Sequence, residues 1–296
     1  MYNRQTLARR RTIQGVGLHS GRPVSMTLSP AAAGSGVVFV RTDAGGVEIP
    51  ADLDHAGPSF YATVIRQGDV VVRTIEHLMA ALYALLVDDV RVELDGDEVP
   101  ILDGSSRPFV DAILDAGRRE LDTPREYITL VRPIVVAEDE KRISAYPCRE
   151  YRVTYAIEFD HPHLQHQELS ASLWGGTAFV DKLAPARTFT FEREVEALRA
   201  RGLALGGSLE NAVVVGDHGI LNPDLRFADE FVRHKMLDLT GDLSLLARPL
   251  RAHVVAFRAG HDLHAKLARR IRDARDAWYL ARWNEESPNL EAAAEA

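Results

Sequence analysis

The stretch FVRHKMLDLTGDL, residues 231–243, places His234 and Asp238 four positions apart in a segment whose pattern predicts a helix. Positions i and i+4 share one face of a helix, so the imidazole and the carboxylate can converge on one point. A third candidate ligand is His77, which directly follows Glu76 in a second predicted helix. Three protein ligands leave one position of a tetrahedral metal for water, which distinguishes catalytic from structural zinc. The pattern therefore predicts a catalytic zinc site.

The composition is typical of a folded protein with two domains. A chain of 296 residues is long for one core, and 46% hydrophobic and 26% charged residues are near the averages for globular domains. The net charge of −8 argues against a general affinity for nucleic acid, whose phosphates require a basic face. The single cysteine, Cys148, cannot form an internal disulfide, which fits a reducing compartment.

The sequence shows no targeting or membrane-spanning pattern. The first residues, MYNRQTLARRRTIQG, are positively charged, but no apolar run follows them, so we do not expect a secretory signal. The longest apolar run, residues 78–87, is about half of the ~20 residues that a membrane span needs. We therefore expect a cytoplasmic protein without a transmembrane segment, and we treat it as a monomer because no feature specifies an assembly.

The first half of the chain is predicted to run from short strands to helices. Strands are expected at residues 11–21, 24–28, 37–40 and 90–94, with a hairpin over 62–72. A helix follows from Ile75, with Thr74 as its N-cap, because apolar residues recur behind it at helical spacing. Ser105 or Ser106 is predicted to cap a second helix over residues 108–116.

Several of these candidate residues have simpler structural explanations. The helix dipole favours any carboxylate in a first turn, which would account for Glu76 without chemistry. His77 could be a core histidine bonded to a backbone carbonyl. The glycines around Leu18 and His19 in GVGLHSG allow close approach to a ligand, but they would equally suit a hairpin connection. The residues alone leave these alternatives open.

The second half repeats the order of strands and then helices, which predicts an α+β architecture of two similar layers. Strands are expected at 127–136, 142–145, 151–159, 212–215 and 251–257, and helices at 192–201, 231–243 and 262–278. His161, His163 and His166 are loosely spaced in a segment broken by proline, so we expect an exposed loop there and assign it no metal.

A domain boundary is predicted near Pro124, where a proline follows polar residues. This divides the chain into an N-terminal domain, 1–124, and a C-terminal domain, 125–283. The acidic, alanine-rich segment 284–296 is expected to be a frayed tail.

Seven stretches of the sequence resemble one known family. They are GVGLHSG (15–21), TIEHLMAAL (74–82), PILDGSSRPF (100–109), ARTF (186–189), LGGSLENAVV (205–214), VRHKMLDLTGDL (232–243) and GHDLHAKL (260–267). The chain resembles the UDP-3-O-acyl-N-acetylglucosamine deacetylases, zinc enzymes of lipid A biosynthesis in Gram-negative bacteria. The stretches occur in the order of the family and cover nearly the whole chain, which makes the series far more specific than a single motif.

The resemblance implies a fold and a role for each site residue. The fold would be two α+β domains, each a sheet with helices, whose helices are sandwiched between the two sheets, with one zinc ion between the domains. By motif position, the zinc ligands are His77, His234 and Asp238, and the general base is Glu76. His261 would be the general acid or an electrostatic partner, with Asp242 oriented toward it. Thr188 would supply a hydroxyl that helps to hold the oxyanion, and Lys235 would contact the substrate. Asp262 and His264 depart from the family pattern, and we expect this to affect only the rim of the substrate site.

The substrate implied by the resemblance, a UDP-linked acylated N-acetylglucosamine, requires a polar region and an apolar region. By motif position, Phe159 would stack on the uracil and Arg258 would meet the diphosphate. The acyl chain would pass the helix 192–201 and the turn 205–209. Expected lining residues of this passage are Val195, Leu198 and Leu203, and further candidate substrate contacts are Leu18, His19, Phe189 and Gly206.

Two other functions compete with this interpretation. A zinc amidase that acts on a different N-acyl substrate would use the same metal ligands, because ligands fix the reaction better than the substrate. A non-catalytic protein stabilised by a metal would instead need four closed ligands and no adjacent base. Glu76 beside His77 favours an enzyme.

Overall fold

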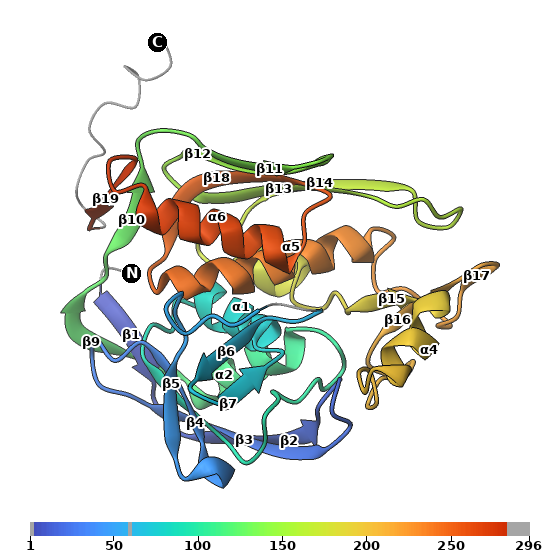
Figure 1. Ribbon diagram of the computed structural model, residues 1–296. Helices are drawn as coiled ribbons and strands as arrows, with labels where there is room; N and C mark the ends of the chain where they lie inside the picture. The colour runs from blue at the N-terminus through green and yellow to red at the C-terminus, as the bar shows by residue number, and fades with distance from the viewer. Residues whose placement is uncertain (1–2, 59–60, 283–296) are drawn as a thin grey trace.

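The computed structural model describes residues 3–58 and 61–282, and a central layer of helices lies between two β-sheets (Figure 1). The lower sheet in this view has the strand order β2-β3-β8-β4-β5. Its strands are β2 (Arg11–Val16), β3 (Pro23–Pro30), β8 (Val90–Leu94), β4 (Val37–Arg41) and β5 (Val47–Pro50). Two pairs of strands flank it: β1 (Asn3–Leu7) with β9 (Arg118–Pro124), and β6 (Val64–Gln67) with β7 (Val70–Arg73).

The upper sheet is built from the second half of the chain and has seven strands. They are β10 (Tyr127–Leu130), β11 (Ile134–Glu138), β12 (Lys141–Pro147), β13 (Tyr151–Glu158), β14 (His166–Ser172), β18 (Leu250–Phe257) and β19 (Trp278–Ala281). A small sheet at the side of the molecule contains β15 (Phe189–Phe191), β16 (Val213–Gly216) and β17 (Gly219–Ile220).

The central layer is helical. The helices are α1 (Glu76–Ala84), α2 (Arg107–Ala116), α3 (Thr177–Lys182), α4 (Glu192–Ala200), α5 (Glu230–Leu243) and α6 (His261–Asp273), with 3-10 turns at Thr42–Ala44 and Ser244–Leu246. Only α4 of the helices in the described residues lies outside the central layer, beside the small sheet (Figure 1). Nearly every residue of α1 and α5 is buried, as expected for helices covered on all sides. The expected α+β fold with helices between two sheets is confirmed.

A glycine allows α1 and α5 to pack closely. A Cβ atom added to Gly241 of α5 would lie 2.1 Å from the carbonyl oxygen of Glu76 at the start of α1. That neighbour is backbone, so it could not move aside without shifting the helix. The glycine at position 241 therefore determines how closely the two helices approach. The side chains of α1 and α5 that face each other form the site described below.

Several predicted helix and strand ends were wrong. Thr74 does not cap α1, because its φ is +58° and its hydroxyl donates to Glu98 at 3.0 Å. Ser106 stands before α2 but its hydroxyl donates to the carbonyl of His77, while the Ser105 hydroxyl accepts from the N–H of Arg107 at 3.2 Å. For Thr74 and Ser106, a contact with a distant residue takes the hydroxyl that the local pattern assigns to a cap, whereas the Ser105 hydroxyl bonds the first N–H of α2, in agreement with the prediction that Ser105 or Ser106 caps this helix.

The second half contains further differences. The predicted strand 127–136 is divided into β10 and β11, and the last helix ends at Asp273 instead of Trp278, because residues 278–281 pair with β10. Neither β14 nor α3 was predicted. His161 is buried and packs against the ring of Phe191, so the predicted exposed loop is partly covered.

Three further predictions concern the domain boundary, the C-terminal tail and membrane-spanning segments. The boundary predicted at Pro124 falls where β9 ends and β10 has not begun, and the division into 1–124 and 125–283 remains a prediction. The predicted tail, 284–296, lies outside the described residues. Within residues 3–58 and 61–282, no helix has the length and hydropathy that crossing a membrane requires.

Candidate active site

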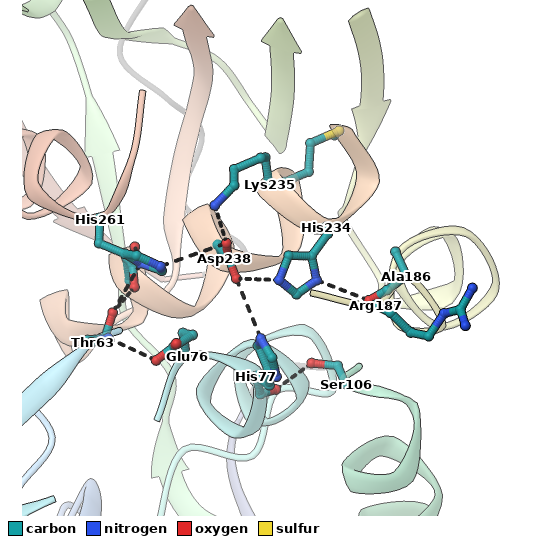
Figure 2. A network of polar contacts seen from close by, with 12 residues as sticks. Thr63, Glu76, His77, Ser106, Ala186, Arg187, His234, Lys235, Asp238 and His261 are labelled. Atoms are coloured by element: carbon teal, nitrogen blue, oxygen red, sulfur yellow. Dashed lines mark hydrogen bonds and ion pairs between the residues drawn. The ribbon is translucent and has the colours of Figure 1, made fainter. Parts of the chain in front are cut away.

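Helices α1 and α5 bring the three predicted metal ligands together (Figure 2). The Nε2 atom of His234 lies 3.2 Å from Oδ1 of Asp238, and Nε2 of His77 lies 3.7 Å from the same oxygen. The ring centroids of the two histidines are 4.9 Å apart. All three side chains are buried. The i and i+4 spacing on α5 thus produces the convergence that the sequence predicted.

The protonation states of these residues fit a metal ion. Burial, with a smaller contribution from His234, lowers the pKa of His77 to about 3, and burial also lowers the pKa of His234. The Nδ1 atom of His234 donates to the carbonyl of Ala186 at 3.1 Å, which leaves a lone pair on Nε2. Neutral imidazoles with free lone pairs are the form in which histidine binds metals.

The carboxylate of Asp238 completes the fit. Burial alone would raise its pKa, but His234 and Lys235 hold that pKa below the usual range, so Asp238 is ionised. Its Oδ1 atom is buried and has no hydrogen-bond partner within the described part of the chain. A carboxylate oxygen that faces imidazole lone pairs without a donor is unfavourable, and a divalent cation among the three atoms relieves this. The set could hold a metal ion.

Lys235 contacts the third ligand. Its Nζ atom donates to Oδ2 of Asp238 at 2.8 Å and lies 5.7 Å from the ring centre of Phe189. The two oxygens of Asp238 therefore face different partners, with Oδ2 toward the ammonium and Oδ1 toward the histidines. Lys235, predicted as a substrate contact, also neutralises part of the charge at the site.

Glu76 lies beside the ligands at the first position of α1 (Figure 2). Its Oε2 atom accepts from the backbone N–H of Thr63 at 3.0 Å. Burial raises the pKa of Glu76 to about 8; His261 opposes this rise, and Asp238 and Asp242 add to it. Such a pKa is suited to a group that exchanges a proton near neutral pH.

His261, at the start of α6, lies on the same side of the ligand set as Glu76 (Figure 2). Its Nδ1 donates to Oδ2 of Asp242 at 2.8 Å, and its Nε2 lies 3.8 Å from Oδ2 of Asp238. Burial alone would lower the pKa of His261, but Asp242 reverses the direction and raises it to about 9. The imidazole is therefore cationic at neutral pH, while Glu76 is a weak acid close to its pKa.

A cavity of about 650 Å³ is lined by some of the predicted substrate contacts. It is lined in part by Leu18, His19, Thr188, Phe189, Val195 and Leu198. Leu203 is not among its lining residues, which corrects that expectation. Gly206 is not either: its N–H donates to Leu18 at 3.0 Å, and a Cβ there would lie 2.3 Å from the carbonyl oxygen of Gly17, so this glycine holds one wall in place.

Phe159 and Arg258 lie together on a second cavity of about 730 Å³. The guanidinium of Arg258 forms an ion pair with the exposed Glu140 at 2.7 Å. The ring of Phe159 packs against Phe189 and Phe191, with centroid separations of 5.9 and 5.4 Å. Because Phe189 also lines the first cavity, the two cavities adjoin through this aromatic contact.

Comparison with known proteins agrees with this geometry. A family model described as "UDP-3-O-acyl N-acetylglycosamine deacetylase" (LpxC) matches residues 4–273. This chain belongs to the LpxC family. The UDP-3-O-acyl-N-acetylglucosamine deacetylase of Myxococcus xanthus is 48% identical over 272 residues, which cover 91% of this chain and 86% of the relative. Proteins of the same name from Citrifermentans bemidjiense and Pseudomonas entomophila are each 44% identical, covering 98% and 94% of this chain and 95% and 93% of theirs.

Some residues of the LpxC site were not found from the sequence. Thr63 contacts both Glu76 and Asp242, and Glu98 accepts from the backbone N–H groups of His19 and Ser20, each at 2.8 Å. Neither residue shows a local pattern, because each acts through partners far away in the chain. Glu98 lies in a sequence typical of a turn, and nothing in that sequence indicates its contacts with His19 and Ser20.

The expectation for the two positions that depart from the family pattern was partly wrong. His264 is fully buried and its Nδ1 donates to Oδ2 of Asp242 at 2.7 Å, so it does not lie at a substrate rim. Asp262 is exposed and pairs with Lys266 at 2.6 Å. The spacing of His261 and His264, three residues apart on one helix, could have indicated that both face the same carboxylate.

Proposed function

We propose that this protein is a zinc-dependent deacetylase that removes the N-acetyl group from a UDP-3-O-acyl-N-acetylglucosamine and releases acetate, a step of lipid A biosynthesis. The observation that carries the proposal is the placement of an acid–base pair, Glu76 and His261, beside the His77, His234 and Asp238 set in a member of the LpxC family (Figure 2). The relatives named above carry this activity in their names.

One zinc ion per chain would be held by His77, His234 and Asp238. A zinc ion supplies Lewis acidity, which activates water and polarises an amide carbonyl. An N-acetyl amide is a weak electrophile, so hydrolysis near neutral pH needs both effects. This set has two nitrogen donors and one oxygen donor, and three such ligands are typical of catalytic zinc sites.

Glu76 is proposed to take a proton from the attacking water. Its carboxylate is held by the backbone N–H of Thr63, which orients the free oxygen toward the site. Its pKa of about 8 in the metal-free protein lies close to the working pH, and a nearby cation favours the ionised form. The group is thus able both to accept a proton and to pass it on.

His261 is proposed to act in its protonated form. Its Nδ1–H is bound to Asp242, so Nε2–H faces the centre of the site and can stabilise the oxyanion or protonate the leaving amine. The hydroxyl of Thr188, on the wall of the 650 Å³ cavity, would contribute to oxyanion binding. Either Glu76 or His261 can deliver the proton to the amine, and the geometry supports both.

The two adjoining cavities suit the two ends of the substrate. The 650 Å³ cavity would take the acyl chain along Val195 and Leu198 of α4, with Leu18, His19 and Phe189 near its inner end. The second cavity would take the nucleotide, with the uracil on Phe159 and the diphosphate on Arg258, which would exchange its exposed partner Glu140 for phosphate. Lys235 would meet the sugar near the metal ligands, and Gly206 would keep the wall beside Leu18 thin.

We also propose that the chain functions as a cytoplasmic monomer of two domains, 1–124 and 125–283, with the site between them. The separate sheets formed by the two halves and the residues that each contributes to the site support this division. The single cysteine supports a reducing compartment.

The decisive experiment combines metal analysis with an acetate-release assay. Purified protein should hold about one zinc per chain and release acetate from UDP-3-O-acyl-N-acetylglucosamine. His234→Ala should lose metal and turnover together, whereas Arg107→Ala, an exposed change on α2, should keep both. Full zinc retention by His234→Ala would contradict the assigned ligands. Release of acetate only from other N-acetyl substrates would identify the protein as a different zinc amidase.

A further inference from the structure

Asp242 of α5 is a buried carboxylate that accepts from three side chains. The Nδ1 atoms of His261 and His264 both donate to its Oδ2, at 2.8 and 2.7 Å. The hydroxyl of Thr63, in the segment that precedes β6, donates to Oδ1. Both histidines lie in the first turn of α6, so one carboxylate ties together α5, α6 and a segment from the first half of the chain.

His264 itself has both ring nitrogens engaged. Its side chain is fully buried, and its Nε2 lies 3.0 Å from the hydroxyl of Tyr155, whose single proton can go either to this nitrogen or to the carbonyl of Ala259 at 2.8 Å. Burial lowers the pKa of His264, although Asp242 opposes this, so the neutral ring is favoured. A neutral ring with its proton on Nδ1 donates to Asp242 and presents its Nε2 lone pair to the phenol. His264 therefore contacts neither the predicted ligands nor the substrate cavity.

We propose that His264 is a positioning residue that acts on the reaction through Asp242 and His261. The torsion that rotates a carboxylate has a broad minimum, so a carboxylate bound on one side only can turn. Thr63 at Oδ1 and His264 at Oδ2 fix the Asp242 group from both sides, which leaves one lone pair of Oδ2 directed at His261. The His261 ring is then held with Nε2 toward the site. This inference rests on the proposed function, because it needs His261 to take part in the reaction.

A purely structural role for His264 makes a different prediction. If the histidine served only to satisfy a buried network between α5 and α6, its replacement would lower the melting temperature and the active fraction. The turnover of the molecules that remained folded would not change. A positioning role requires a loss of kcat in folded, zinc-loaded protein, with little change in KM, because the substrate cavity does not include His264.

Two amide substitutions separate the two nitrogens of His264. The side-chain nitrogen of Asn lies near the place of Nδ1, and that of Gln lies near the place of Nε2. H264N should therefore keep the bond to Asp242, with kcat within about threefold of the parent, whereas H264Q should lose it. We expect kcat of H264Q to fall roughly 10- to 100-fold, the range seen when groups that orient a site residue are removed. Tyr155→Phe is the matched control, because it removes the hydroxyl that faces Nε2 and the carbonyl of Ala259 but leaves the bond from Nδ1 to Asp242, so kcat should stay within about threefold.

A second measurement does not depend on activity. In metal-free protein labelled with ¹⁵N-histidine, the Nδ1–H proton of His261 should be protected from exchange in the parent and in H264N. It should exchange rapidly in H264Q, because the Asp242 group is then free to turn. Thr63→Val removes the other anchor of the same carboxylate and provides the same test if H264Q does not fold.

The outcomes are distinct. Equal kcat for H264N and H264Q at equal folded fraction, or an unchanged His261 signal in H264Q and Thr63→Val, would overturn the positioning role. If the parent releases no acetate from the substrate while the His261 signal responds as expected, the proposed function fails and the orienting role of His264 toward His261 stands.

Discussion

Asp238 uses its two carboxylate oxygens for different partners. Oδ2 accepts from Lys235 at 2.8 Å, and Oδ1 faces the Nε2 atoms of His77 and His234. An ammonium has three donors, so Lys235 can hold Asp238 and still offer protons to a substrate. A single lysine is thereby able to link ligand geometry to substrate binding.

Glu76→Gln should separate catalysis from metal binding. Gln keeps an oxygen that can accept from the Thr63 N–H but cannot take a proton from water, so kcat should fall about 100-fold or more while zinc content stays near one per chain. The measurement is kcat at full zinc occupancy together with metal analysis. Near-normal turnover would return Glu76 to the simpler role of a carboxylate favoured by the helix dipole.

At the level of residues, the sequence predicted site residues that show a local spacing pattern or a family motif. It did not predict residues whose partners lie far away in the chain. The i and i+4 spacing identified His234 and Asp238, and the family resemblance added Glu76 and His261. The carbonyl of Ala186, which fixes the tautomer of His234, could not be predicted because any residue carries a carbonyl. Thr63 was missed for a related reason, since its partner Asp242 comes from the other half of the chain.

The start of α5 is fixed by a buried ion pair. Glu230, the first residue of α5, accepts from the backbone N–H and the guanidinium of Arg187 and from the backbone N–H of Arg226. Arg187 directly follows Ala186, whose carbonyl accepts from His234. The pair thus supports both the helix and the segment that orients one of its metal ligands.

Glu230→Gln should lower stability in a pH-dependent way. Burial alone would raise the pKa of Glu230, but Arg187 holds the pKa below that of the unfolded chain, so its stabilisation is present above about pH 4.5 and is lost as pH falls through the folded pKa. Near pH 7 we expect a loss of about 3 kcal/mol, because Arg187 would remain buried without its partner. Melting temperatures should be measured from pH 7 down to about pH 2, and those of the two proteins should converge only below about pH 4.5, as pH falls through the folded pKa of Glu230.

The exposed Glu120 supplies the control for this change. The melting temperature of Glu120→Gln should stay close to that of the parent at every pH. A difference between Glu230→Gln and the parent that stayed the same down to about pH 2 would show that the charge of Glu230 is not the cause.

Gly241→Ala should push α1 and α5 apart. The added methyl would meet the backbone carbonyl of Glu76 at 2.1 Å, so we expect a loss of about 1–3 kcal/mol of stability and weaker zinc binding. Gly96→Ala is the control, because its nearest neighbours are side-chain atoms of Val24 at 3.3 and 3.7 Å. Unfolding by urea and zinc titration measure both effects. Unaltered zinc affinity in Gly241→Ala would mean that the ligands tolerate a wider helix spacing.

Helices with strong periodicity were predicted well, and ends set by tertiary contacts were not. Residues 231–243 differ from α5 by one residue, because the apolar pattern and the burial agree. The last helix was extended five residues too far, since pairing of β19 with β10 overrides a helical pattern that local propensity would continue. Pro133 divides the predicted strand 127–136, a position where proline removes a donor.

At the scale of the whole molecule, the set of predicted metal ligands and the 650 Å³ cavity receive residues from both halves of the chain. A zinc-chelating hydroxamate with an apolar tail should therefore inhibit much more strongly than one without a tail. Each buried methylene contributes about 0.8 kcal/mol, or roughly fourfold in affinity. Inhibition constants for a series of tail lengths measure the gain.

Val195→Trp tests where the tail lies. The larger side chain would fill part of the 650 Å³ cavity, so the gain from the tail should shrink while inhibition by the tail-less compound stays the same. Equal inhibition by tailed and tail-less compounds in the parent would argue against an acyl passage beside α4.

The meeting of α1 with α5 also bears on how the chain folds. His77 and Asp238 are separated by more than half of the chain, so their encounter requires the closure of a very long loop. Such non-local contacts form slowly, because loop-closure entropy must be overcome before they stabilise anything. Each half can acquire its strands first, but neither half alone can provide all three ligands. Tight binding of the metal during refolding should consequently be one of the last events. The signal of an added zinc indicator would therefore show when the two halves of the chain have come together.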